Sequence, residues 1–210
     1  MIDYKNKIIF VHIHKAAGKS LCRSLERNLF PQLINNSEFM YYHYKKRFSK
    51  KHIVYENNII KKHSSALEYK KYFGNDFKKY FKFAFSRNPY DWQVSMFRYM
   101  KEHINHKQHN IIKDFNFDEY IEWRCSEDLN YQSDYILDNN KNIIVDFIGK
   151  VENIYEDMNK VSKLANYNFK IPHVNKSNLI KNNNFHNKST IGMINKYFEI
   201  DFEVFNYKKL

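Results

Sequence analysis

The segment from Lys7 to Leu25, KIIFVHIHKAAGKSLCRSL, constrains the fold of this chain more than any other part of the sequence. A short apolar run predicts a buried strand, the small residues Ala16, Ala17 and Gly18 predict a tight turn, and leucines spaced four apart predict a helix directly after it. The first turn of such a helix presents free N–H groups and the positive end of the helix dipole. The segment therefore predicts a site for a phosphate-like group.

Two interpretations of this loop remain open from the local pattern. Lys15 and Lys19 add positive charge and Ser20 adds a hydroxyl donor, but a plain strand–turn–helix connection can also be small and basic. The ending Gly18-Lys19-Ser20 matches the Walker A loop of nucleotide kinases, GxxxxGK[ST]. Ile13 stands where the first glycine of that loop belongs, and a β-branched residue lacks the backbone freedom to wrap the loop around a phosphate.

Composition indicates a folded protein with an acidic partner. The 210 residues are predicted to form a single domain over 1–210, and the hydrophobic content of 43% excludes a disordered chain. The net charge of +12 favours nucleic acid, an anionic membrane surface, a nucleotide or an acidic glycan as partner. The two cysteines have no CxxC pairing, and no signal segment or membrane-spanning run is visible. We therefore expect a cytoplasmic protein, with peripheral membrane contact left open.

Short apolar strands alternate with amphipathic helices along the chain, which predicts an α/β fold with a mainly parallel sheet. Besides the first strand, strands are expected at Phe39–Tyr42, His52–Tyr55, Phe81–Phe85 and Ile143–Ile148. A helix is expected from Ser65, which has capping-box spacing with Glu68, to Phe73, ending at Gly74. Further helices are expected from Pro89 through Tyr99, over 117–123 and 131–137, after Asn153, and from Ser189 to Phe205. Residues 103–118 and 173–188 are predicted to be loops.

A second candidate anion site lies in the segment Phe81 to Tyr99, FKFAFSRNPYDWQVSMFRY. Arg87 follows the expected strand, at the end where parallel sheets bind their ligands. Ser95 lies eight residues further on, a little over two helical turns, so it can share a direction with the start of the helix. Arginine and serine together suit a phosphate. The alternative is that Arg87 pairs with Asp91 and Ser95 only packs.

Together the two segments resemble the carbohydrate (type 2) branch of the sulfotransferases that use 3′-phosphoadenosine 5′-phosphosulfate (PAPS). The first family motif, similar to FVHIPKTGGTS, is matched by Phe10–Ser20, and the second, similar to FxFVRNPYDRLVSxY, by Phe83–Phe97. Weaker matches follow in the family's order and extend the resemblance over nearly the whole chain: Lys62–Ala66, Val145–Asn153, Pro172–Ser177 and Asp201–Tyr207.

The resemblance implies a P-loop-like three-layer α/β fold, with a central mainly parallel sheet flanked by helices, and transfer of a sulfuryl group from PAPS to a carbohydrate hydroxyl. It implies that Lys15 stabilises the leaving oxygen and that Arg87 and Ser95 bind the 3′-phosphate. The 5′-phosphate would be held by residues of the loop and the first helical turn: Lys15, Ala16, Ala17, Gly18, Lys19, Ser20 and Leu21. No metal is required.

His63 matches the histidine that the family is proposed to use as general base, and imidazole titrates near working pH. The other interpretation of His63 is a surface histidine in a lysine-rich segment. His12 and His14 are predicted to lie at the core edge and in the pocket, respectively, with no third metal ligand placed beside them.

The chain departs from the family pattern at several positions. His14 replaces a proline, Ala16-Ala17 replaces Thr-Gly, Lys19 replaces a threonine and Ser86 replaces a valine. Trp92 stands where arginine is usual, which either removes a structural salt bridge or puts the indole on the adenine side.

Two other functions are weighed against the sulfotransferase. A P-loop kinase would need a glycine at 13 and a Walker B aspartate, for which Asp146 is a poor substitute. A nucleic-acid-binding protein would suit the charge but would leave the ordered motifs unexplained.

Overall fold

The computed structural model describes residues 1–18, 21–22, 53–54, 59–169 and 185–210. It divides into two compact units, the first formed from Met1–Ser86 and Asp134–Val174 and the second from Arg87–Ser133 and Asn175–Leu210. The predicted strand at Phe39–Tyr42, the leucines at 25 and 29, and the segment Pro172–Ser177 lie outside the described residues.

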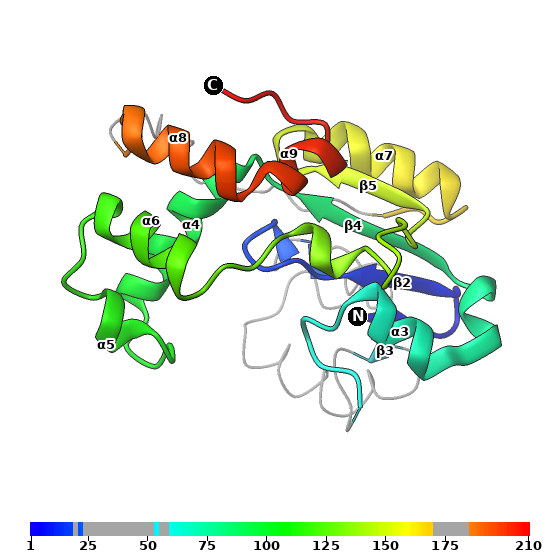
Figure 1. The fold of residues 1–210 in the computed structure, drawn as a ribbon. Helices are drawn as coiled ribbons and strands as arrows, with labels where there is room; N and C mark the ends of the chain where they lie inside the picture. Colours follow the sequence, from blue (N-terminus) through cyan, green and yellow to red (C-terminus); the bar gives the residue numbers. More distant parts are fainter. Residues whose placement is uncertain (19–20, 23–52, 55–58, 170–184) are drawn as a thin grey trace, which may run out of the picture. The chain divides into compact units, whose positions relative to one another are not determined.

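In the part of the chain that the structure describes, the first unit contains a mixed sheet of five strands (Figure 1). Its order is β3-β1-β2-β4-β5, in which β2, β4 and β5 run parallel and β1 is antiparallel to both of its neighbours. The strands are β1 (Ile2–Asp3), β2 (Ile8–Val11), β3 (Ile53–Val54), β4 (Phe81–Ser86) and β5 (Phe147–Lys150). The predicted α/β class is confirmed, and the parallel part of the sheet joins the strands that the sequence analysis placed before the two candidate anion sites.

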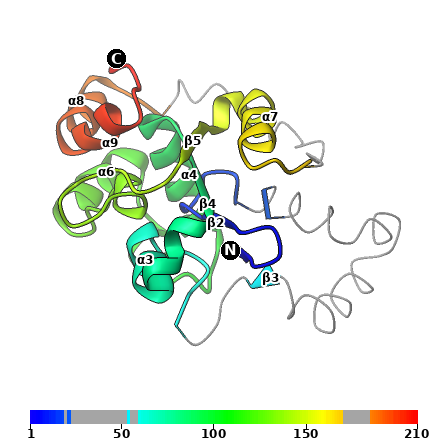
Figure 2. The ribbon, with the colours of Figure 1, turned by 90° about the vertical axis from the view of Figure 1, so that its right-hand side faces the viewer.

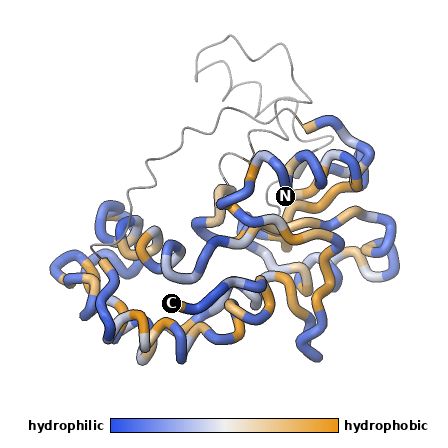
Figure 3. Tube along the Cα trace, turned by 90° about the horizontal axis from the view of Figure 1, so that it is seen from above, coloured by the Kyte–Doolittle hydropathy of each residue, from blue (hydrophilic) through white to orange (hydrophobic). Residues whose placement is uncertain are grey.

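Hydrophobic pairing sets the register of the parallel strands. Ile8 lies opposite Phe81 and Val11 opposite Ala84, and β2 is buried along its length, as expected for an apolar run without alternation. Figure 3 shows hydrophobic stretches of the chain beside the N-terminus. Because β2 and β4 are parallel and in this register, their carboxyl ends meet at one edge of the sheet.

Two helices of the first unit follow the sequence signals closely. Helix α3 (Ala66–Phe73) begins at a complete capping box between Ser65 and Glu68 and ends at Gly74, whose φ of +53° suits glycine. The 3₁₀ helix η3 (Gly74–Lys79) then leads into β4. Helix α7 (Ile154–Leu164) follows the short η5 (Val151–Asn153) and packs beside β5 (Figures 1 and 2).

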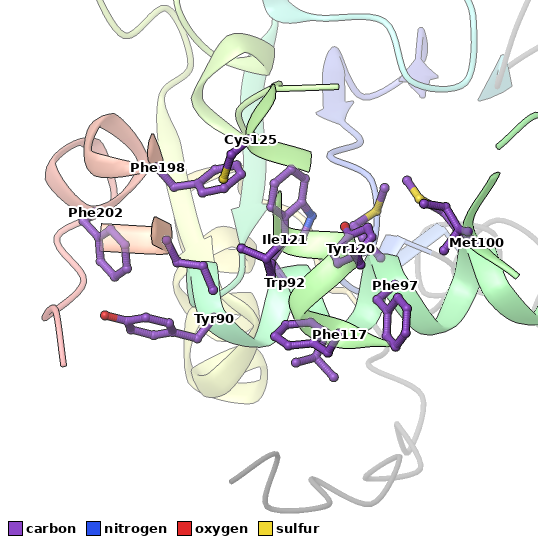
Figure 4. Close-up of a cluster of buried hydrophobic side chains, with 14 residues drawn as sticks. Tyr90, Trp92, Phe97, Met100, Phe117, Tyr120, Ile121, Cys125, Phe198 and Phe202 are labelled. Atoms are coloured by element: carbon purple, nitrogen blue, oxygen red, sulfur yellow. The ribbon is translucent and has the colours of Figure 1, made fainter. Parts of the chain in front are cut away.

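The second unit is helical and is built around an aromatic cluster (Figure 4). Its helices are α4 (Pro89–Glu102), α5 (His109–Ile112), α6 (Phe117–Ser126), α8 (Lys188–Tyr197) and α9 (Glu199–Val204). Pro89 is the first residue of α4, as the sequence predicts, and Asn88 caps the helix. Trp92 lies in the cluster with Phe97, Tyr120 and Phe198 around it.

Several predicted boundaries are wrong. The expected loop 103–118 contains the short helix α5, and the expected strand 143–148 starts four residues later, at Phe147, because Ile143 instead pairs with Leu137 in an isolated bridge. The last helix is interrupted at Phe198, which separates α8 from α9. Residues 131–137 contain only a 3₁₀ turn, η4 (Ser133–Tyr135).

Two glycines provide a matched test of this packing. A Cβ on Gly149 would lie 2.5 Å from the buried ring of Phe85, whereas a Cβ on Gly192, inside α8, would meet nothing within 4 Å. We expect Gly149→Ala to lower the free energy of unfolding by about 1–3 kcal/mol through overpacking. Gly192→Ala should raise it by about 0.5–1 kcal/mol through helix propensity. Urea denaturation of both variants checks the pair, and equal stabilities would contradict the packing around β5.

Candidate active site

The loop after β2 has the predicted strand–turn–helix geometry as far as it is described. The carbonyl of Ile13 accepts the N–H of Ala16 at 3.4 Å, closing a turn, and the carbonyl of Ala17 accepts the N–H of Leu21 at 3.2 Å, which is the first helical bond. Lys15 and Ala17 both adopt left-handed backbone conformations, with φ of 59° and 56°. Left-handed backbone conformations are uncommon in residues other than glycine, and they are concentrated in functional loops. Their occurrence at Lys15 and Ala17 therefore supports a functional role for this turn.

Position 18 requires a glycine because the ring of His12 leaves no space for a side chain, and not because of the backbone conformation of Gly18. A Cβ at position 18 would lie 1.5 Å from Nε2 of His12, so the His12 ring occupies the space that any side chain there would need. His12 is itself buried and its ring stacks on Phe10, with centroids 5.5 Å apart. The loop therefore closes over the His12 ring.

Three histidines meet beside this loop. The ring of His63 lies between those of His12 and His14, at centroid distances of 4.2 Å and 3.5 Å, and the His14 pair is nearly parallel, at 20°. Tyr135 approaches His14 edge-on at 5.9 Å. His12 is buried, which agrees with its predicted place at the core edge, and His63 is brought next to both rings; the place of His14 in a pocket stays a prediction.

The hydrogen bonding of His63 determines its tautomer. Nδ1 of His63 lies 2.9 Å from the backbone carbonyl oxygen of His12. Because a carbonyl oxygen only accepts, Nδ1 carries the proton and the lone pair of the neutral ring is on Nε2. Burial lowers the pKa of His63 below its ordinary value, and the positive charge of Lys62 acts in the same direction, while the bond to His12 opposes them. The ring is thus kept neutral, in the form of a base.

The predicted 3′-phosphate residues belong to the second unit. Arg87 follows Ser86, the last residue of β4, in the chain, and Ser95 lies in α4. Ser95 shares with Asp91, Arg98 and Tyr99 the less buried stripe of this helix. Lys15, Ala16, Ala17, Gly18 and Leu21 lie in the loop and first helical turn of the first unit, whereas Lys19 and Ser20 lie outside the described residues.

The backbone of Arg87 is held by a residue that the sequence analysis did not select. Oε1 of Gln132 accepts the N–H of Arg87 at 2.9 Å, and Nε2 of Gln132 donates to the carbonyl of Arg87 at 2.8 Å. The two residues are 45 positions apart, so no local spacing signals the contact.

Asp146 does not have the position of a Walker B aspartate. It immediately precedes β5, where its carboxylate accepts the backbone N–H of Lys82 at 2.7 Å and pairs with the Lys82 ammonium at 2.8 Å. Lys82 is near the start of β4, so this pair is at the amino ends of the parallel strands, whereas the loop 12–18 leaves from the carboxyl end of β2. The structure thus argues against the kinase interpretation.

Trp92 belongs to the core of the second unit. Its side chain is 1% exposed, its ring lies 5.6 Å from the guanidinium of the fully buried Arg124, and it meets Phe198 edge-on. Arg124 in turn pairs with Asp128. This burial argues against contact of Trp92 with an adenine.

Cys22 and Cys125 are both free. Within the described ranges there is no group of three or more histidine, cysteine or acidic side chains that could hold a metal ion. None of the helices in that part of the chain is long and apolar enough to cross a membrane.

Comparison with known families decides the relationship that the motifs suggested. The model of the sulfotransferase family, of the carbohydrate type, matches residues 1–208. The chain belongs to the sulfotransferase family. No curated protein and no solved structure matches it. The family match covers both units, confirms the resemblance found in the sequence, and identifies the protein as a transferase of sulfuryl groups; members generally use PAPS as the donor.

The buried histidines predict a stability that rises with pH. Burial lowers the pKa of His12 to about 2, and that of His63 is lowered as well. Below pH 6.5, the ordinary pKa of histidine, the unfolded chain binds protons that the folded protein does not. The contribution of these two residues to the free energy of unfolding is therefore fully present above pH 6.5 and is lost as the pH falls. For His12 the loss is up to about 1.4 kcal/mol per pH unit.

The measurement is urea denaturation between pH 7.5 and 5, with His12→Gln beside the native protein. The variant should show a shallower dependence, by about one proton. An unchanged slope would show that His12 is not the neutral, buried group that the geometry indicates.

Proposed function

We propose that this sulfotransferase transfers a sulfuryl group from PAPS to a hydroxyl of a carbohydrate acceptor, by in-line displacement with His63 as general base. The observation that carries the proposal is the bond between Nδ1 of His63 and the carbonyl of His12, the residue that opens the loop 12–18. It joins a neutral imidazole with a defined tautomer to the loop that resembles the family's first motif.

In this mechanism Nε2 of His63 takes the proton of the acceptor hydroxyl. The acceptor oxygen forms a bond to sulfur while the bond from sulfur to the phosphate oxygen breaks, and adenosine 3′,5′-bisphosphate leaves. Negative charge grows on the leaving phosphate, which the ammonium of Lys15 and the backbone N–H groups from Ala17 to Leu21 would stabilise. Fixed donors are effective here because they need no reorganisation during the reaction.

Arg87 and Ser95 would bind the 3′-phosphate, the group that distinguishes this donor from ATP. Arg87 supplies a planar fork for the phosphate oxygens and follows β4, whose carboxyl end lies beside that of β2. The carbohydrate acceptor is proposed from the branch of the family that the chain matches. The basic segment 43–63, which the net charge of +12 suggests for an acidic acceptor, lies mostly outside the described residues.

The donor is tested by thermal melting with adenosine 3′,5′-bisphosphate, with ATP plus magnesium, and with an oligonucleotide. At a hundredfold excess over its dissociation constant, the bisphosphate should raise the melting temperature by roughly 5–11 °C. No shift with the bisphosphate and a clear one with ATP would return the protein to the kinase class. A shift with the oligonucleotide alone would favour nucleic-acid binding.

The role of Arg87 is tested with Arg87→Ala, and Arg98→Ala is the control. Each variant removes one positive charge, the first just before α4 and the second within it. Arg98 lies over the ring of Phe185, 4.9 Å from its centroid, and has no assigned ligand. We expect Arg87→Ala to weaken the bisphosphate about tenfold or more, through loss of a charge-assisted contact, and to leave adenosine 5′-monophosphate nearly unaffected. Calorimetric titration measures both; equal losses for the two nucleotides would remove Arg87 from the 3′-phosphate site.

For His63 we expect His63→Ala to retain bisphosphate binding and to lose transfer by about a hundredfold or more. Because the pKa of His63 is lowered by burial, the acidic limb of kcat/KM in the native enzyme should lie below pH 6.5. The check is a rate assay over pH 5–8 with an acceptor sugar. Normal turnover by His63→Ala would assign the base elsewhere.

A further inference from the structure

A buried network in the second unit ends on the backbone of Arg87. Its first part is the pair of hydrogen bonds between the Gln132 side chain and the N–H and carbonyl of Arg87. Gln132 is fully buried, so these bonds are shielded from water, and both polar groups of its amide are used on one residue. The Gln132 side chain therefore bonds to both backbone groups of Arg87, as the backbone of a neighbouring strand would.

The second part of the network fixes Gln132 itself. The two carboxylate oxygens of Asp201, in α9, accept the backbone N–H groups of Gln132 and Ser133, each at 2.9 Å. All three residues are fully buried. A carboxylate suits this position because it offers acceptors on both oxygens and no donor that would face an N–H.

Asp201 belongs to a motif that the proposed chemistry does not use. It opens the segment Asp201–Tyr207, which matches the closing motif of the family. The contacts connect this segment to Arg87 in two steps: Asp201 holds the backbone at 132–133, and Gln132 holds the backbone of Arg87. A terminal helix is thereby coupled to the residue that follows β4.

We infer that Gln132, held by Asp201, is a positioning residue for Arg87 and so for recognition of the 3′-phosphate; this rests on the proposed function. A guanidinium fork binds phosphate well only when its direction is set, and that direction starts from the backbone. Gln132 fixes that backbone through its N–H and its carbonyl at once. Loss of these two bonds lowers the affinity for a ligand that carries a 3′-phosphate and leaves the affinity for a ligand without one unchanged.

The experiment compares two nucleotides that differ only in that group, adenosine 3′,5′-bisphosphate and adenosine 5′-monophosphate, by calorimetric titration. Gln132→Met keeps the size of the side chain and removes both bonds to Arg87. We expect the ratio of the two affinities to fall about tenfold. The control is Gln93→Met, which alters another fully buried glutamine of this unit, bonded to the hydroxyl of Tyr120, and should leave the ratio unchanged.

A purely structural role would lower the stability of Gln132→Met and leave the affinity ratio as in the native protein, and that result overturns the inference. If Gln132→Met does not fold, Asp201→Asn takes its place, since it keeps one acceptor oxygen and replaces the other with a donor. The ratio should then fall in the same direction, and an unchanged ratio in folded Asp201→Asn again overturns the inference.

Amide hydrogen exchange of Arg87 separates this inference from the proposed function. Gln132→Met should speed the exchange of the Arg87 N–H, because its acceptor is lost, while Gln93→Met should not. If the native protein binds the bisphosphate no more tightly than adenosine 5′-monophosphate, the proposed function is wrong. The role of Gln132 in phosphate recognition is then wrong too, even if the exchange rates show that Gln132 holds the backbone of Arg87. If the native preference is present and exchange and affinity ratio both stay unchanged in Gln132→Met, only the inference fails.

Discussion

The parallel pairing of β2 with β4 determines where the loop after β2 and the segment after β4 leave the sheet. Val11 lies opposite Ala84, so the loop that begins at His12 and the segment that begins at Arg87 leave the sheet from the carboxyl ends of adjacent strands. Parallel α/β sheets bind ligands at such ends. At the opposite, amino ends of the strands, Lys82 near the start of β4 forms an ion pair with Asp146, which immediately precedes β5. The ion pair and the loop 12–18 therefore lie at opposite ends of the parallel strands.

Sequence reasoning succeeded where a few neighbouring residues determine the structure. The capping box at Ser65 and Glu68, the glycine that ends α3, and the proline that begins α4 each act through contacts within one helical turn, so their spacing is visible in the chain. The strand before the loop and the turn of small residues were predictable for the same reason. His63 was selected as a candidate base from the order of the motifs, and its tautomer was not predictable, because Nδ1 bonds to a residue 51 positions away.

Failures of prediction came from long-range contacts that override local preference. The apolar run Ile143–Ile148 reads as one strand, but its first residue pairs with Leu137 and only Phe147 onward pairs with β4. The final apolar stretch reads as one helix, but it divides at Phe198, whose ring is buried against Trp92. Gln132 lies in no motif and Asp201 lies in one to which no chemistry is assigned, so their hydrogen bonds to distant backbone groups are visible only in the structure.

The contact between Gly18 and the His12 ring has a consequence for how this loop can change in evolution. Because the ring fills the volume where a side chain at 18 would begin, the two positions share a single space. A larger residue at 18 is compatible only with a smaller one at 12, and His12 is also the residue whose carbonyl orients His63 through its backbone. That carbonyl is present whatever side chain stands at 12. Residues 12 and 18 can therefore covary in size while the backbone acceptor for His63 is retained.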